Sequence, residues 1–275
     1  MLERTKKVET KLHGTPHEHI KLLQKHKIPY ILSYTTSSAI LKTEHEKLVF
    51  AEDRITNLEH KLRNQLKKEI KDRVKNIVKN EYTPLYYRWS EHFAEFRIKP
   101  QESIEAKNVW EVDLTKAYYY SAYILGYISE DFFNKTLTLP KKIRLRLLGS
   151  IATIKNIETF DGEEIDYEKV YDPLFRTVWH NVSCKVDIVM SDIANALGDH
   201  FLFYWVDGIY FTTFGELDTC SHIAEGIAYH HNFEIHKTKL DKIKVKNMDG
   251  YLHAEIWKGN DCKIFCVANK SLNDI

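Results

Sequence analysis

Apolar residues between about 40 and 80 recur at intervals of three and four positions. The series consists of Ile55, Leu58, Leu62, Leu66, Ile70, Val74 and Ile77. This spacing is typical of a long amphipathic helix with an apolar stripe on one side and charged residues on the other. A Thr-Pro pair in the segment NEYTPLYYRW (80–89) indicates a turn after this helix. We therefore predict that residues 1–100 form a mostly helical N-terminal region.

Beyond residue 105 the pattern changes to short apolar strands that alternate with helices. The predicted strands cover 108–115, 234–247, 250–257 and 262–269, and the predicted helices cover 117–128, 140–154, 182–200 and 216–233. A hairpin at 200–214 contains the segment FYWVDGIYF (203–211), in which an Asp-Gly pair favours a tight turn. Residues 101–275 are thus predicted to form an α+β domain, with helices packed on an antiparallel sheet.

Composition places the chain among ordinary globular proteins. It has 275 residues, of which 43% are hydrophobic and 29% charged, so a sizeable core can form. Four cysteines are too few for a disulfide framework, which favours a reducing compartment. The N-terminus lacks the apolar core of a signal peptide, and no stretch is apolar enough to span a membrane. We expect an intracellular, cytoplasmic protein without a membrane partner, including the case of a phage- or plasmid-infected cell.

The positive charge of the chain is local. The net charge is only +1, but residues 61–80 carry eight Lys or Arg against two acidic residues. Such a stripe is compatible with binding to a polyanion, and it is equally the pattern of a solvated helix face.

Two aspartates stand at the ends of apolar strands in the second region. Asp113 ends the strand in WEVDLTKAYYYSA, and Asp207 lies at the predicted hairpin tip. Carboxylates held close together repel unless a cation lies between them, and Mg²⁺ prefers carboxylate and phosphate oxygens. The pair therefore indicates a metal site suited to in-line phosphoryl transfer. Two simpler roles stay open, since Asp207 could only favour a turn and Asp113 could only cap the next helix.

The segments around these aspartates resemble the palm of family-B DNA polymerases. DLTKAYY (113–119) resembles the first palm motif, Asp-x-x-Ser-Leu-Tyr-Pro, with its aspartate at Asp113 and its tyrosine at Tyr118. FYWVDGI (203–209) resembles the third motif, Tyr-x-Asp-Thr-Asp-Ser, with Asp207 at the second aspartate. The order of the motifs and the strand, helix, helix and hairpin around them agree with the same family.

The chain also departs from the family's motifs. Lys116 and Tyr119 replace the serine and proline of the first motif, and Trp205 replaces the first aspartate of the third. KKIRLRLLG (141–149) resembles the middle motif, Lys-x-x-x-Asn-Ser-x-Tyr-Gly, at its lysine, Lys141, and at its glycine, but lacks the asparagine, serine and tyrosine.

The resemblance implies a role for each matching residue. Asp113 and Asp207 would be the catalytic ligands of a two-ion Mg²⁺ or Mn²⁺ site. The backbone at Leu114 would contact the triphosphate, and Tyr118 would pack beneath the incoming sugar. The implied phosphate ligands are Lys141 and Arg144, and the implied contacts to the DNA backbone are Lys242, Lys244 and Lys246.

The resemblance predicts a helical region at 1–100 followed by a polymerase palm with reduced fingers at 101–275. The expected activity is a Mg²⁺-dependent DNA nucleotidyltransferase that adds deoxynucleotides to a DNA 3′ end, as a small DNA polymerase or a template-independent terminal transferase. The expected partners are a primer end, a deoxynucleoside triphosphate and a replication protein. The alternative is a palm remnant that has lost catalysis and binds nucleic acid or a replication partner, which the missing motif residues favour.

Two further residue groups indicate other functions. His17 and His19 alternate as they do in rolling-circle nucleases, although Glu18 stands where those enzymes have a bulky apolar residue. Cys262, Cys266 and His253 would supply three zinc ligands, but their spacing lacks the paired ligands of a zinc site, which favours ordinary structural thiols.

Overall fold

The computed structural model describes residues 8–12, 15–35, 38–51, 57–79, 94–96, 98, 101–151, 153–213, 219–248 and 251–268. The chain forms two compact units, and each unit combines two stretches of sequence. The first unit is Met1–Lys71 with Thr138–Thr177, and the second is Asp72–Leu137 with Val178–Ile275. This division differs from the single boundary expected near residue 100. The turn predicted at 80–89 lies outside the described residues.

The first unit contains a six-stranded sheet with the order β1-β4-β3-β2-β7-β8. Its strands are β1 (Val8–Leu12), β2 (Tyr30–Tyr34), β3 (Ser38–Lys42), β4 (Glu46–Ala51), β7 (Lys155–Phe160) and β8 (Ile165–Val170). β1 pairs with β4 in parallel, and all other neighbours are antiparallel. Alternate residues of the central strands, such as Leu32, Leu41 and Phe160, form one buried face. Helix α1 (His17–Lys25) packs Ile20 and Leu23 against that face.

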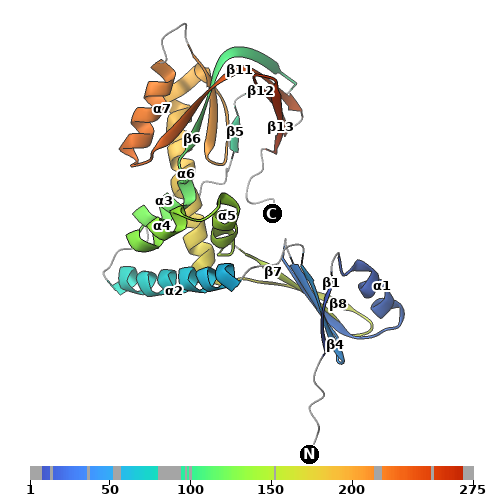
Figure 1. Ribbon diagram of the computed structural model, residues 1–275. Coiled ribbons are helices and arrows are strands. Elements are labelled where there is room, and N and C mark those ends of the chain that lie inside the picture. The colour runs from blue at the N-terminus through green and yellow to red at the C-terminus, as the bar shows by residue number, and fades with distance from the viewer. Residues whose placement is uncertain are drawn as a thin grey trace, which may run out of the picture. The chain divides into compact units, whose positions relative to one another are not determined.

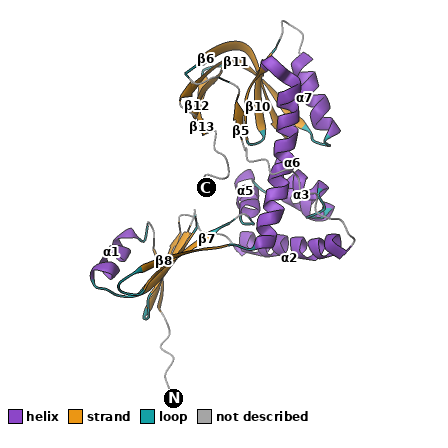
Figure 2. Cartoon of the chain, turned by 180° about the vertical axis from the view of Figure 1, so that it is seen from behind, coloured by secondary structure: helices purple, strands orange, loops and turns teal. Residues whose placement is uncertain are grey.

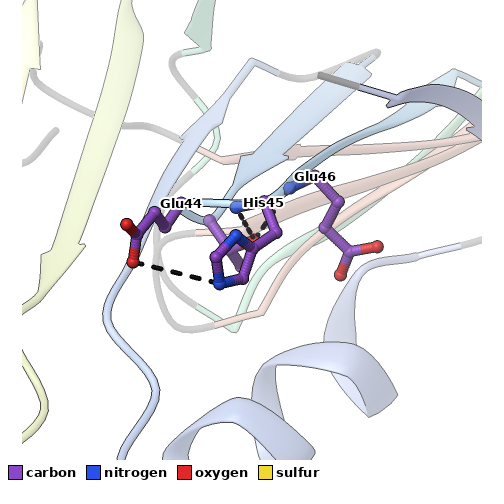
Figure 3. Close-up of polar contacts among 4 residues, drawn as sticks. Glu44, His45 and Glu46 are labelled. Atoms are coloured by element: carbon purple, nitrogen blue, oxygen red, sulfur yellow. Dashed lines mark hydrogen bonds and ion pairs between the residues drawn. The ribbon is translucent and has the colours of Figure 1, made fainter. Parts of the chain in front are cut away.

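A surface turn connects β3 to β4 (Figure 3). The Thr43 amide donates to the Glu46 carbonyl at 3.0 Å, and the Thr43 hydroxyl accepts the amides of His45 and Glu46 at 3.3 and 3.1 Å. The exposed side chains of His45 and Glu44 approach to 4.0 Å. These contacts stay within the turn, and they explain how the hairpin closes.

The amphipathic helix predicted in this part of the sequence is present as α2 (Asn57–Lys79). Leu62, Leu66 and Ile70 form its buried stripe. Helix α5 (Lys141–Gly149) packs beside its first turns, where Arg146 forms an ion pair with the buried Glu59. The prediction of a mostly helical region at 1–100 missed strands β1 to β4, because their short apolar runs fell outside the long helical period.

The second unit contains a seven-stranded antiparallel sheet with the order β13-β12-β11-β6-β10-β9-β5, which curls at the β12 and β13 side (Figure 1). Its strands are β5 (Ala94–Phe96), β6 (Ser103–Leu114), β9 (Phe201–Trp205), β10 (Gly208–Thr212), β11 (Ile235–Met248), β12 (Tyr251–Lys258) and β13 (Asp261–Ala268). Its helices are α3 (Ala117–Ile124), α4 (Glu130–Leu137), most of α6 (Pro173–Leu197) and α7 (Thr219–His230).

The two faces of this sheet are covered differently. Helices α3, α6 and α7 pack on one face around Val112, Leu114 and Ile209 (Figure 2). The other face closes on itself as the sheet curls, with a core that includes Val109, Tyr210 and Val245. Both cores form from strands with a two-residue period, so each strand contributes to both faces.

An irregularity in the β6–β11 pair changes which residues face which side. Asn108 has a positive φ of 57°, and no pair is formed between Asn108 and Asp241. On either side of this point, Leu240 and Ile243 both lie in the core of the curled face, although they are three residues apart. Side chains of odd-numbered β6 residues therefore face the curled core at Val109 and the opposite side at Lys107.

Most predicted elements of the second region are confirmed. The strand at 108–115, the helices at 117–128 and 182–200, and the hairpin at 200–214 correspond to β6, α3, part of α6, and β9 with β10. The fold is mixed α+β with largely antiparallel sheets, as predicted. The helix expected at 140–154 ends at Gly149, and strands β7 and β8 follow it.

Candidate active site

Backbone pairing brings Asp113 and Asp207 to the same end of the seven-stranded sheet. Asp113 is the residue directly opposite Gly208 in the β6–β10 pair. The Leu114 amide donates to the Asp207 carbonyl at 2.9 Å. Asp207 thus lies in the turn of the β9–β10 hairpin, and Asp113 lies near the end of the adjacent strand β6. The two strands are hydrogen-bonded to each other at this point.

The hairpin turn is one residue earlier than the Asp-Gly pair predicts. Trp205 pairs with Gly208, so the two turn residues are Val206 and Asp207. Val206 adopts a positive φ of 61°, which is unusual for a β-branched residue. This backbone conformation is a strained one, and it is located next to a candidate catalytic carboxylate.

The Asp113 side chain lies on the curled face of the sheet, over Gly208. A Cβ atom at position 208 would lie 3.7 Å from Oδ1 of Asp113. Glu111 and Tyr210, one pair further along the same two strands, face the same side, and the Tyr210 hydroxyl donates to Glu111 at 2.6 Å. Burial raises the Tyr210 pKa, and the negative charges of Glu111, Asp113 and Asp207 raise it further. Three carboxylates therefore act on one tyrosine.

Tyr118 also lies close to these acidic groups. Its ring stacks on Trp179 of α6, with the centroids 5.3 Å apart and the planes 11° from parallel. Burial raises the Tyr118 pKa, and the charges of Asp207 and Asp187 raise it further. The Tyr118 hydroxyl is thus within the electrostatic influence of Asp207, and its expected place beneath an incoming sugar stays a prediction.

Asp187 is a candidate that the sequence analysis missed. It lies on α6 with only 6% of its surface exposed, and it accepts a hydrogen bond of 2.6 Å from the Tyr204 hydroxyl. Its only signal in the sequence is a carboxylate on the apolar face of a helix, between Val186 and Val189. A buried carboxylate is costly unless its oxygens are hydrogen-bonded, so Tyr204 stabilises the charged form of Asp187.

The structure does not support the expected role of the Leu114 backbone. The Leu114 N–H already donates to the backbone carbonyl of Asp207. The next N–H, that of Thr115, donates to the Glu234 carbonyl at 2.8 Å. The Leu114 side chain is buried in the helix-covered core. Neither amide is therefore positioned to bind a triphosphate.

The two expected phosphate ligands belong to the other compact unit. Lys141 and Arg144 lie on α5 in the first unit, whereas Asp113 and Asp207 lie in the second. Lys141 is exposed and Arg144 is half-buried. Their expected role stays a prediction.

Lys242, Lys244 and Lys246 do lie on one face of a strand, as expected, but not on the Asp113 face. They alternate with Ile243 and Val245, which are buried in the curled core. Because Asp113 faces that core side, the three lysines point to the opposite side of the sheet. Lys242 also pairs with Glu105 at 2.8 Å. The three lysines are therefore not placed to contact a primer end held at Asp113. They face the other side of the sheet because of the irregularity at Asn108.

The two rival residue groups gain no support. His17 and His19 lie in helix α1, where residues two apart do not face each other, rather than on a strand. His253 pairs with Cys266 across β12 and β13, and Cys262 pairs with Trp257. No group of three or more His, Cys, Asp or Glu residues suited to a metal ion occurs within the described ranges.

The residues near Asp113 fit a hard divalent cation by their chemistry. Asp113 and Asp207 carry carboxylate oxygens, which Mg²⁺ and Mn²⁺ prefer. No sulfur or imidazole ligand is needed for such a site. Asp113 and Asp207 are the residues that would hold the ions.

No protein family's sequence pattern matches the chain, and no curated protein matches it significantly. In the part of the chain that the structure describes, no helix is long and apolar enough to cross a membrane.

Proposed function

We propose that the protein is a Mg²⁺-dependent nucleotidyltransferase with a family-B-like palm, which adds deoxynucleotides to a DNA 3′ end. The observation that carries the proposal is the pairing of β6 with β10, which sets Asp113 opposite Gly208 and bonds Leu114 to Asp207. Two sequence segments about ninety residues apart, chosen for their resemblance to two palm motifs, meet at one end of one antiparallel sheet.

Asp113 and Asp207 would hold divalent ions between the primer end and the triphosphate. Bound Mg²⁺ or Mn²⁺ would supply charge neutralisation on the attacking and leaving oxygens. The hairpin fixes the Asp207 backbone through Leu114, and Gly208 leaves room for the Asp113 carboxylate. The chain thus fixes the Asp207 backbone and leaves room for the Asp113 carboxylate before any ligand binds.

The triphosphate contact expected from Leu114 fits the start of helix α3 better. The first amides of an α-helix have no intrahelical acceptor, and an anion is attracted to them. Helix α3 begins at Ala117, four residues after Asp113 along the chain. We assign the phosphate contact to these amides, because those of Leu114 and Thr115 are already bonded.

Tyr118 and Trp179 would form the wall beside the sugar. Their stacked rings come from α3 and α6. Because its pKa is raised, the Tyr118 hydroxyl stays protonated at neutral pH and can donate a hydrogen bond. A large aromatic side chain at this position leaves little room for a ribose 2′-hydroxyl, which favours deoxynucleotides.

The alternative function is binding without catalysis, by a palm remnant that holds nucleic acid or a replication protein. Trp205 favours it, because an aromatic residue replaces the first aspartate of the third motif. Trp205 is 42% exposed and lies beside Gly208, on the Asp113 side of the sheet. An exposed aromatic ring there could stack on a base, as in proteins that bind single strands.

Primer extension with labelled deoxynucleotides and Mg²⁺ or Mn²⁺ tests the proposal. Asp113→Asn and Asp207→Asn should each reduce incorporation by at least about a hundredfold, a barrier increase of roughly 3 kcal/mol, because each removes an anionic ligand. The exposed Asp199, changed to Asn, is the matched control and should keep full activity. Circular dichroism checks that the variants fold.

Two outcomes would contradict the proposal. Incorporation by either variant at more than about a hundredth of the wild-type rate would mean that other carboxylates carry the reaction. A wild-type protein that binds a primer but incorporates nothing with either metal would favour the binding function.

A further inference from the structure

A row of three cations follows one side of helix α2 in the first unit. Arg63, Lys67 and Lys71 are spaced four residues apart, so each lies about 6 Å further along the helix axis than the one before. The row flanks the buried stripe of Leu62 and Leu66, which fixes this side of the helix against the unit. The three positive groups are therefore held in one line by the helix.

Packing against Phe175 restricts two of these side chains. The Nζ atoms of Lys67 and Lys71 each lie 5.2 Å from the centroid of the Phe175 ring. Phe175 is itself buried, in the first turn of α6. Cations over an aromatic ring are attracted to its face, so the ring positions the two ammonium groups.

The acidic residues nearby do not balance the row. Lys71 has Asp172 at 3.9 Å. The buried Glu59, one turn before Arg63, is paired with Arg146 of α5. Arg63 Nε is buried and has no hydrogen-bond acceptor among the described residues. Among the described residues, Asp172 is thus the carboxylate within ion-pair distance of the row, and it contacts Lys71.

The electrostatic repulsion within the row acts most clearly on its middle residue, Lys67. Burial lowers the Lys67 pKa, and the neighbouring charges of Arg63 and Lys71 lower it further, against an opposing effect of Asp172. Like charges four residues apart on a helix repel each other and destabilise it. An anion that contacts two of the cations at once would remove this repulsion.

We propose that the row Arg63, Lys67 and Lys71 binds the phosphodiester backbone of a nucleic acid. The choice of nucleic acid as the ligand rests on the proposed function. A row of fixed, evenly spaced cations matches a chain of regularly spaced phosphates better than it matches a single small anion. Lys242 and its neighbours are weaker candidates, because Lys242 is already paired with Glu105.

Fluorescence anisotropy of a labelled single-stranded oligonucleotide tests this proposal. The measurement is made with the full chain in EDTA and without nucleotides, so that it does not depend on catalysis. The double variant Arg63→Gln/Lys67→Gln should bind roughly tenfold more weakly at low salt. The slope of log K against log salt should become shallower by about 1.4, since each lost phosphate contact on a single strand removes about 0.7.

The matched control is Lys21→Gln/Lys25→Gln. These two exposed lysines lie four residues apart on α1 of the same unit, so the control removes the same charge at the same spacing. It should bind like the wild type. Equal losses in the two double variants would overturn the proposal, because only net charge would then matter.

Further variants keep the test independent of folding and of the proposed activity. Lys67→Arg keeps the positive charge and should bind like the wild type. Lys71→Gln changes a side chain that is 52% exposed, and it should make the slope of log K against log salt shallower by about 0.7 without affecting the fold. Binding that depends on the row in a protein that incorporates nothing would refute the enzyme proposal alone, whereas incorporation with row-independent binding would refute this inference alone.

A competitor separates nucleic acid from other polyanions. Inorganic polyphosphate, at the same phosphate concentration as unlabelled oligonucleotide, should displace the label no better than the oligonucleotide. Displacement by polyphosphate at a tenfold lower concentration would identify polyphosphate as the preferred ligand and overturn the assignment to nucleic acid.

Discussion

Replacement of Val206 by asparagine should stabilise the protein, even though it places a polar residue where a half-buried valine stands. Val206 is the first turn residue of the β9–β10 hairpin and has a φ of 61°. A left-handed conformation costs an L-residue about 1 to 2 kcal/mol, and a β-branched side chain belongs at the upper end of this range. Asparagine adopts the same conformation at much lower cost.

The expected gain follows from two opposing terms. Relief of strain contributes about 1.5 kcal/mol. A fully buried valine contributes about 1.5 kcal/mol through its apolar surface, so a half-buried one loses about 0.7 kcal/mol on replacement. The free energy of unfolding of Val206→Asn should therefore rise by about 1 kcal/mol. Val206→Gly should be near neutral, because glycine also adds roughly 0.5 to 1 kcal/mol of backbone entropy to the unfolded chain.

Urea unfolding followed by tryptophan fluorescence measures this difference in the relevant unit, since all five tryptophans lie in the second unit. Ile264→Asn is the matched control. Ile264 is a β-branched residue on β13 that is 65% exposed and has no positive φ. It should lose up to about 1 kcal/mol through lower strand propensity. A Val206→Asn variant that is less stable than the wild type would refute the assignment of strain to this turn.

Two further predictions concern buried charge and alkaline pH. Arg146→Met should lower the free energy of unfolding by about 3 kcal/mol, because it leaves the Glu59 carboxylate buried without its cation, and Glu59→Gln should cost less; equal losses in urea unfolding would contradict this. The pKa values of Tyr204 and Tyr210 are raised in the folded state, first by burial. Their contribution to stability is complete below about pH 10, the unfolded tyrosine pKa, and is lost as the pH rises above it, because the unfolded chain then releases its protons first. Tyr210→Phe should therefore make the loss of unfolding free energy above pH 10 shallower by up to about 1.4 kcal/mol per pH unit.

The sequence predicts the second unit well because its strands alternate cleanly and its helices are long. The hairpin of β9 and β10 has apolar strands around a short polar turn, and the helix period of α6 spans many turns. The elements that were missed carry weaker signals. Every residue of β8 (Ile165–Val170) is exposed, so its sequence has no buried face to produce an alternation. The strands β2 and β3 are only five residues long each, too short to be distinguished from apolar loop residues.

The candidate site is predictable only in part for a different reason. A motif can identify Asp113 and Asp207, because their roles depend on residue type and order. Asp187 could not be found this way, since its importance comes from the Tyr204 hydroxyl and from its effect on Tyr118, which are contacts across elements. The side of the sheet on which Lys242 lies depends on the irregularity at Asn108, and an alternating pattern alone does not reveal such a point.

The simpler explanations of the two aspartates can now be compared with their geometry. Asp113 does not occupy the N-cap position of the helix that follows, because α3 has Lys116 as its N-cap, with a φ of 56°. If Asp207 only favoured a turn, the residue with a positive φ would be one that tolerates it, but Val206 takes that position and Gly208 does not. The N-cap position of α3 is thus held by Lys116, and the positive φ of the turn falls on Val206, directly before Asp207. Under the proposed function, a ligand shared by both carboxylates would offset the cost of this turn.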